Sequence, residues 1–179
     1  MRPFFLTMRF PNSLQNAIEQ ETVAIGSKPL AQAAAELSER YRHRHHTTDK
    51  FIITDTDRLA YAVVRMPATY VASRAALLET LRLAPELQIE SLLDLGAGTG
   101  AASWAAAGIF DQLRQFTLLE QDNRLIELGR KLAQSSEHQA LRAANWQLAN
   151  LRMTPAFPVH DIIICSYSLN EIDLVAVNR

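Results

Sequence analysis

The chain has 179 residues, 48% of them hydrophobic and 21% charged, which suits one folded domain and argues against a disordered chain. Its formal net charge of −1 at pH 7 argues against a protein that coats nucleic acid through bulk positive charge. Cys165 is the only cysteine, which excludes a disulfide within the chain, and no segment has the pattern of a signal peptide or a membrane span, so we expect a cytoplasmic protein.

The first third of the sequence has the apolar spacing of helices. Ser13 is placed to cap a short helix, and Pro29 is placed in the first turn of a second one. A third apolar stripe over residues 59–66 meets Pro67, where the missing N–H predicts a kink or a restart. Arg74 falls on the apolar face of the segment that follows, so its guanidinium must reach water or a partner.

From Glu90 onward, short apolar runs alternate with helix-like segments. The four runs are SLLDL at 91–95, FTLLE at 116–120, NWQLA at 145–149 and DIIICSYS at 161–168. Strands that alternate with helices predict βαβ units and a parallel sheet whose strands are buried on both faces. We therefore expect an α/β fold in two parts, with a helical region over residues 1–85 and a ligand-binding domain over residues 86–179.

A glycine-rich turn follows the first predicted strand. Gly96, Gly98 and Gly100 lie between LLDL and an alanine-rich helical segment, and glycine leaves the backbone bare for a ligand to approach. The next strand ends at Glu120, 24 residues after Gly96, where a carboxylate can accept hydrogen bonds from two ribose hydroxyls. The turn and the acid together predict a nucleotide-like ligand at the carboxyl edge of the sheet.

The candidate ligands differ in how well they fit the residues around this turn. The run GAGTGA formally satisfies the dinucleotide pattern, so a nicotinamide dinucleotide stays open. Asp94, two residues before Gly96, would repel a pyrophosphate but can meet the ammonium group of S-adenosylmethionine. The lysine and hydroxyl pair of a P-loop are missing. The sequence therefore favours S-adenosylmethionine over a dinucleotide.

The runs LLDLGAGTG and LLEQD resemble motifs I and II of class I S-adenosylmethionine-dependent methyltransferases. The stretches RMPATY and SYSLNE are more specific, and with LAQAAAELSERYR they resemble the bacterial and mitochondrial small-ribosomal-subunit methyltransferase-like family. The resemblance extends over nearly the whole chain from about residue 30. It implies a Rossmann-like class I methyltransferase sheet, S-adenosylmethionine as cofactor, and work on the small ribosomal subunit and its RNA, with or without methylation.

The resemblance also implies which residues line the cofactor. These are Asp94, Gly96, Ala97 and Gly98 at the methionine end, Glu120 at the ribose, Gln121 and Asn150 at the adenine, and Ser166 on the methyl side. Asn150 stands where such enzymes often have an Asp. The run SYSLNE differs from the N-P-P-Y pattern of methyltransferases that modify exocyclic base nitrogens, which disfavours that reaction. No general base stands out, so the catalytic residues stay unassigned.

The last residue, Arg179, comes shortly after the fourth predicted strand, whereas the resemblance implies a sheet of seven strands. The order of that sheet would leave the apolar run 161–168 at an edge, open to pairing with another chain. The family often carries a cysteine cluster for an iron–sulfur centre, which Cys165 alone cannot supply. We therefore expect an incomplete sheet, in a chain that is a fragment or a reduced gene product.

The run RYRHRHH at 40–46 suggests a partner. Arg40, Arg42 and Arg44 are candidates to contact RNA phosphates, while its histidines fit a solvated helix end better than a metal site. Three hypotheses stay open on the sequence alone. The chain is a methyltransferase-like protein that binds S-adenosylmethionine, a non-catalytic assembly factor that binds ribosomal RNA, or a nicotinamide-dependent oxidoreductase.

Overall fold

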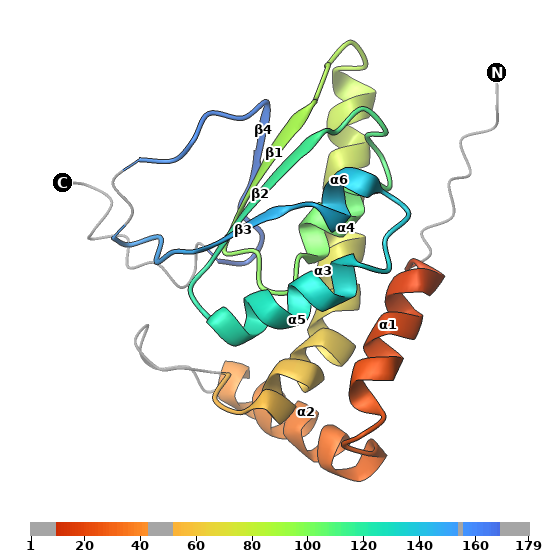
Figure 1. Ribbon diagram of the computed structural model, residues 1–179, viewed down its shortest axis with the longest axis vertical. Helices are drawn as coiled ribbons and strands as arrows, with labels where there is room; N and C mark the ends of the chain where they lie inside the picture. The colour runs from red at the N-terminus through yellow and green to blue at the C-terminus, as the bar shows by residue number, and fades with distance from the viewer. Residues whose placement is uncertain (1–9, 43–51, 154–155, 169–179) are drawn as a thin grey trace.

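The computed structural model describes residues 10–42, 52–153 and 156–168, which form a group of helices packed on a small α/β unit (Figure 1). Along the chain the elements are α1 (Asn12–Thr22), α2 (Ser27–Arg42), α3 (Asp55–Leu83), β1 (Ser91–Leu95), α4 (Ala101–Ala107), β2 (Gln115–Glu120), α5 (Asn123–Ala133), α6 (Gln139–Arg142), β3 (Asn145–Leu148) and β4 (Ile162–Ile164). The predicted order of helices first and alternating strands and helices afterwards is confirmed.

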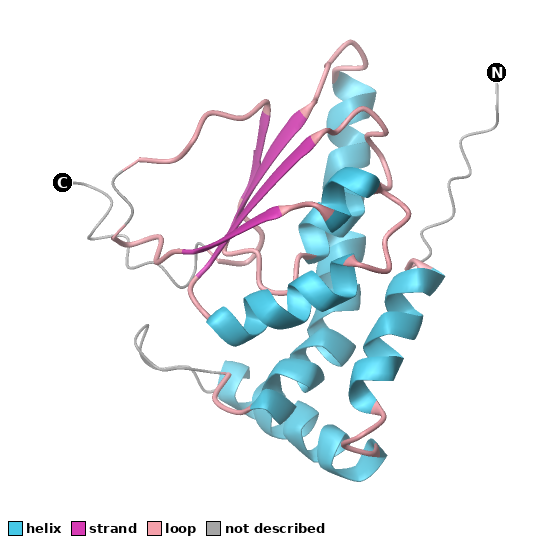
Figure 2. Cartoon of the chain, in the orientation of Figure 1, coloured by secondary structure: helices cyan, strands magenta, loops and turns pink. Residues whose placement is uncertain are grey.

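The four strands form one parallel sheet in the order β3-β2-β1-β4. Leu93 on β1 pairs with Thr117 on β2 and with Ile163 on β4, so β1 is central. β1 and β2 are buried along most of their length, as expected for parallel strands. The prediction of strands buried on both faces is wrong for β3 and β4, which lie at the two edges of the sheet formed by the described residues and are mostly exposed or half-buried. The helices α4 and α5 connect β1 to β2 and β2 to β3 and lie on the same side of the sheet (Figure 2). The parallel α/β sheet is confirmed.

α3 is a helix of 29 residues that begins at a capping box. The Asp57 N–H donates to Thr54 Oγ1 at 3.0 Å, and the Asp57 carboxylate accepts from the Thr54 N–H at 2.9 Å. The helix continues through Pro67, so the predicted restart there is wrong. Proline removes only one backbone donor, and the buried face with Met66 and Tyr70 supports the helix on both sides of it.

α3 joins the helical region to the α/β unit. It packs against α1 and α2 on one side and against α4 on the other. One continuous hydrophobic core accordingly includes Leu14 from α1, Met66 from α3, Trp104 from α4 and Phe116 from β2. The residues between α3 and β1 include Pro85, the predicted boundary, but the two parts share their core.

β4 lies at the edge of the sheet formed by the described residues, where it pairs only with β1. The strand is shorter than the predicted run 161–168, because regular pairing ends at Ile164. Tyr167 then takes a left-handed backbone conformation, with φ of 62°. The side chain of Ile163 is 54% exposed, so the edge presents apolar surface to solvent.

Candidate cofactor site

The glycine turn lies at the carboxyl edge of the sheet, between β1 and α4. Gly98 has a left-handed φ of 57°, which a residue with a side chain adopts only with strain. The N–H groups of Gly96 and Ala97 both donate to the Leu119 carbonyl, at 2.9 and 3.0 Å. The turn is therefore held against the end of β2.

Glu120, the last residue of β2, meets this turn directly. Its Oε2 accepts a hydrogen bond from the Gly98 N–H at 2.9 Å, and its Oε1 accepts from the N–H groups of Gln121 and Asp122 at 2.8 and 2.9 Å. The residue is 7% exposed. The two sequence features that predicted a nucleotide site thus converge on one point.

Two buried carboxyl groups lie at this edge. Asp94 is 1% exposed, and its Oδ2 accepts a hydrogen bond from Ser103 Oγ at 2.8 Å. Burial raises the pKa of Asp94 to about 6, although the hydrogen bond from Ser103 opposes that rise and the Glu120 charge adds to it. Burial also raises the pKa of Glu120 against its three backbone hydrogen bonds. The edge therefore favours a cationic group near these acids and disfavours an anionic one.

The space that each glycine leaves open is taken up by a side chain from elsewhere in the protein. A Cβ at Gly96 would lie 2.7 Å from Ser168 Oγ, and a Cβ at Gly98 would lie 3.1 Å from the Tyr61 hydroxyl. Ser168 Oγ in turn donates to the Leu95 carbonyl at 2.7 Å. The sequence analysis missed Tyr61, because nothing in its local pattern says that α3 crosses the glycine turn.

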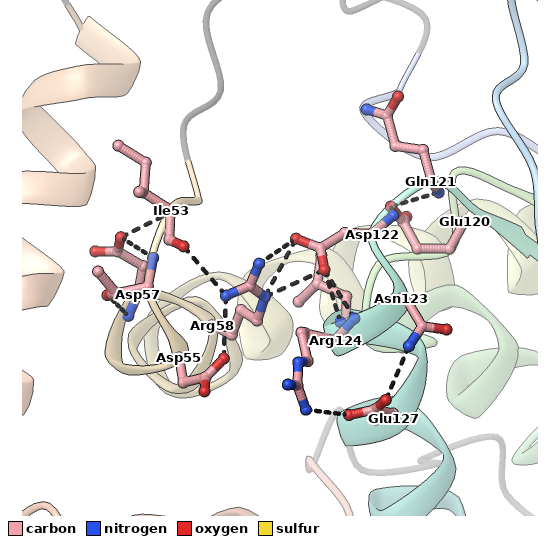
Figure 3. Close-up of polar contacts among 12 residues, drawn as sticks. Ile53, Asp55, Asp57, Arg58, Glu120, Gln121, Asp122, Asn123, Arg124 and Glu127 are labelled. Carbon is pink, nitrogen blue, oxygen red and sulfur yellow. Dashed lines mark hydrogen bonds and ion pairs between the residues drawn. The ribbon is translucent and has the colours of Figure 1, made fainter.

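α3 is also tied to the start of α5, next to Glu120 (Figure 3). Arg58 donates from Nε to both carboxylate oxygens of Asp122, at 3.2 and 3.1 Å, and from Nη2 to Oδ2 at 2.7 Å. Asp122 is the N-cap of α5 and accepts from the N–H groups of Arg124 and Leu125. One carboxylate therefore orders both the helix start and the contact with α3.

Comparison with known proteins identifies the family. The family model described as mitochondrial small ribosomal subunit Rsm22 matches residues 55–177. The chain belongs to the Rsm22 family. It is also similar to the human protein named ribosome assembly protein METTL17, mitochondrial, with 25% identity over 120 residues. This match covers 64% of the chain but spans only about a quarter, 25%, of the length of that relative.

The match to the Rsm22 family begins at α3, the helix that brings Tyr61 to the glycine turn and Arg58 to the start of α5. Thr99, inside the turn, is 1% exposed, and its hydroxyl has no hydrogen-bond partner among the described residues. Buried hydroxyl groups are rarely left in this state. Thr99 was not singled out in the sequence, although its position between two glycines could have suggested it.

The remaining predicted cofactor residues do not lie together at one point. Ala97 is buried in the turn, and Gln121 is exposed beside Glu120. Asn150 is exposed after β3, where its Oδ1 accepts from the Arg152 N–H at 3.0 Å. Ser166 Oγ lies 3.2 Å from Ser73 Oγ on α3. These four assignments stay predictions.

Arg65, Tyr70 and Trp146 pack against other parts of the protein. The Arg65 guanidinium stacks over the Tyr41 ring at 4.6 Å, and Tyr70 packs edge-on against Phe10. Trp146 is buried, and its ring fills the space in front of Gly100. Tyr70 and Trp146 both belong to the hydrophobic core.

The predicted RNA contacts are engaged within the protein where they are described. Arg40 donates to both carboxylate oxygens of Asp57, at 3.2 and 2.5 Å. Burial opposes ionisation of Asp57, but its hydrogen bonds from Arg40 and from two backbone N–H groups lower its pKa to about 2. Arg42 pairs with Glu39, and Arg44 lies outside the described residues.

Within the described part of the chain, no group of three or more His, Cys, Asp or Glu side chains could hold a metal ion. The histidines of the run at 40–46 lie outside it. In the same part of the chain, no helix has both the length and the apolar character needed to cross a membrane.

Proposed function

We propose that this Rsm22-family chain binds S-adenosylmethionine at the carboxyl edge of its sheet and works with the small ribosomal subunit as a methyltransferase-like protein. The cofactor assignment rests on the hydrogen bond from the Gly98 N–H to the Glu120 carboxylate, beside the buried Asp94. The family match and the human assembly protein support the ribosomal assignment.

The residues at this edge fit such a cofactor better than a dinucleotide. Raised pKa values at Asp94 and Glu120 mean that negative charge is already unfavourable there, and a pyrophosphate would add to it. A sulfonium or ammonium group would relieve it. The unpartnered Thr99 hydroxyl supplies a further hydrogen-bonding group inside the turn.

Each side chain has a distinct task in this proposal. Glu120 accepts hydrogen bonds from the ribose hydroxyls, and its three backbone donors keep the carboxylate fixed and oriented. Asp94 offers negative charge to the ammonium group from behind the turn, held by Ser103. Gln121 and Asn150 border the adenine. When bound, the cofactor supplies a methyl group on a sulfonium, which a nucleophile takes by direct displacement.

A non-catalytic assembly factor is the second candidate. It is favoured by the packing of the turn, since Ser168 occupies the open side of Gly96 and Tyr61 lies against Gly98. A protein that binds the cofactor only to stabilise its fold has no need of an open path from the methyl group to a substrate. The two candidates share the cofactor site and differ in whether a methyl group is transferred.

Calorimetry with S-adenosylmethionine, S-adenosylhomocysteine and NAD tests the site. We expect binding of the first two, and loss of binding in Gly98→Asp, because that side chain adds both bulk and negative charge. Gly26→Asp is the matched control: Gly26 also has a left-handed φ, of 79°, but nothing lies within 4 Å of its missing Cβ. Binding of NAD alone, or equal affinity in Gly98→Asp, would reject the assignment.

Transfer of a radiolabelled methyl group to small-subunit particles separates the two candidates. Label in the RNA or protein of the particle supports the methyltransferase. Cofactor binding without transfer, together with binding of the chain to immature particles, supports the assembly factor. Absence of binding to small-subunit particles would reject the ribosomal part of the proposal while leaving the cofactor site intact.

A further inference from the structure

Arg74, on the buried side of α3, has two nitrogens without an acceptor. The residue is 4% exposed, and neither Nε nor Nη1 has a hydrogen-bond partner among the described residues. Two other arginines that link elements have carboxylate partners: Arg40 pairs with Asp57, and Arg58 pairs with Asp122. An unpaired buried charge is strongly unfavourable, so native proteins normally provide a partner for it.

The Tyr70 hydroxyl is a hydrogen-bond donor near Arg74. Tyr70, one helical turn earlier, is 3% exposed, and burial raises the pKa of its hydroxyl while the nearby Arg74 charge lowers it. The Tyr70 hydroxyl lies 3.7 Å from the position that a Cβ would take at Gly108. Gly108 ends α4 and is exposed. The buried Tyr70 hydroxyl therefore lies beside the C-terminal end of α4.

We propose that Arg74 and Tyr70 form a binding site for one oxyanion, a phosphate or carboxylate group, between α3 and the C-terminal end of α4. An oxyanion can accept two parallel N–H bonds from either edge of a guanidinium, the Nε and Nη2 edge or the Nη1 and Nη2 edge. In Arg74 each edge includes one nitrogen, Nε or Nη1, that lacks an acceptor. The Tyr70 hydroxyl donates a third hydrogen bond.

This site is distant from the glycine turn, although Ser73, next to Arg74, lies 3.2 Å from Ser166, a predicted cofactor residue. Tyr61, the residue of α3 at the glycine turn, precedes Arg74 by 13 residues, which corresponds to about 20 Å along a helix. The proposal therefore stands or falls independently of S-adenosylmethionine binding.

A structural role for Arg74 is the competing explanation. The last carbonyl groups of α4, including those of Trp104 and Ala105, lie 3.7 Å from the Cβ position of Gly108. An arginine near a helix C-terminus can donate to such carbonyls and interact favourably with the helix dipole. In that case Arg74 stabilises the protein without any ligand, and its removal destabilises the fold.

The thermal stability of Arg74→Met and of the wild type, in the presence of added anions, separates the two explanations. Inorganic phosphate or sodium acetate is added at constant ionic strength, with sodium chloride as the reference salt. We expect one of the anions to raise the Tm of the wild type by a few degrees and to leave Arg74→Met unchanged. A response to phosphate alone indicates a phosphate group, and a response to acetate alone indicates a carboxylate. Arg82→Met is the matched control, because Arg82 is exposed and already pairs with Glu79.

The chain without added anion gives a second readout. We expect Arg74→Met to be at least as stable as the wild type in sodium chloride, because the substitution removes an unpaired buried charge. A lower Tm of Arg74→Met, with equal anion responses in both proteins, overturns the proposal in favour of the structural role.

Nuclear magnetic resonance of the wild type keeps the test decisive even where Arg74→Met does not fold. The Nε–H resonance of Arg74 is expected to shift and saturate during titration with the active anion. Tyr70→Phe, which removes one donor, is expected to bind about five- to tenfold more weakly. An unmoved Arg74 resonance with both phosphate and acetate rejects the site.

Discussion

Arg58 on α3 and Asp122 at the start of α5 are joined by three hydrogen bonds across 64 residues of sequence. Both side chains are largely buried, at 14% and 22% exposure. Asp122 follows Glu120 by two residues, and the N–H of Asp122 donates to the Glu120 carboxylate. The helical region is therefore fastened to the same short segment that holds the proposed ribose ligand.

Replacing Arg58 with Met should weaken both the fold and the proposed cofactor site. Removal of one partner leaves Asp122 without its charged donor in a partly buried position, and we expect a loss of about 2 kcal/mol in the free energy of unfolding. Affinity for S-adenosylmethionine should fall with it, since the segment 120–122 loses its anchor. Urea denaturation and calorimetry on the same variant measure both effects.

The exposed pair of Arg82 and Glu79 is the control for that experiment. Both side chains are more than half exposed, so Arg82→Met should change the free energy of unfolding by less than about 0.5 kcal/mol. Asp122→Asn keeps a capping oxygen for α5 and completes a double-mutant cycle with Arg58→Met. Additive effects in that cycle would show that the two residues do not interact in solution.

Asp94 should make the cofactor-free protein less stable as the pH rises from about 4 to about 6. Its pKa is raised by burial to about 6, from 3.8 in the unfolded chain, so the folded state holds the proton more tightly over that window. Asp94→Asn keeps an acceptor for Ser103 and cannot titrate. The difference in unfolding free energy between the variant and the wild type should therefore grow by up to about 3 kcal/mol between pH 4 and pH 7.

The acids whose pKa values are lowered act in the opposite direction at lower pH. Asp57, with a pKa of about 2, contributes stability that is lost as the pH falls below about 4. The pH range over which Asp57 changes the stability therefore does not overlap the range expected for Asp94. Parallel curves for Asp94→Asn and the wild type above pH 4 would contradict the assignment of that titration to Asp94.

The sequence was sufficient for the features that depend on local pattern. Alternating apolar runs gave the parallel strands, and the spacing of glycines and Glu120 gave the edge where they meet, because strand direction and connection length determine where parallel strands end. The restart expected at Pro67 does not occur, because packing of α3 against α1, α2 and α4 outweighs the loss of one backbone hydrogen bond.

The contacts between distant elements could not be predicted from one sequence. Arg58 is one of several arginines in the helical region, and only the path of α3 past α4 and α5 brings it to Asp122. The same path places Tyr61 at Gly98 and Ser73 at Ser166. Arg40 looked suited to RNA because of its basic neighbours, whereas its position in the fold gives it a carboxylate partner.

Glu120→Gln should destabilise the protein even without ligand. The wild-type carboxylate accepts three backbone N–H groups, and an amide presents at least one N–H toward these donors. We expect a loss of about 1–3 kcal/mol in the free energy of unfolding, and loss of S-adenosylmethionine binding in calorimetry. Glu127→Gln, on the exposed face of α5, is the control and should alter neither. Full cofactor affinity in Glu120→Gln would remove that residue from the proposed site.

Gly129→Ala tests the packing between α5 and β3. In most helices this change is stabilising by about 1 kcal/mol. At this position the new Cβ would lie 2.9 Å from Cζ2 and 3.0 Å from Cζ3 of the Trp146 ring, and closer still to Cη2, so the ring must move. We expect a net loss of about 1–3 kcal/mol, measured by urea denaturation. Trp146→Leu shortens the opposing side chain, and in that background Gly129→Ala should become neutral or stabilising. If Gly129→Ala stabilises the wild-type protein, the Trp146 ring does not occupy the face of α5 described for it.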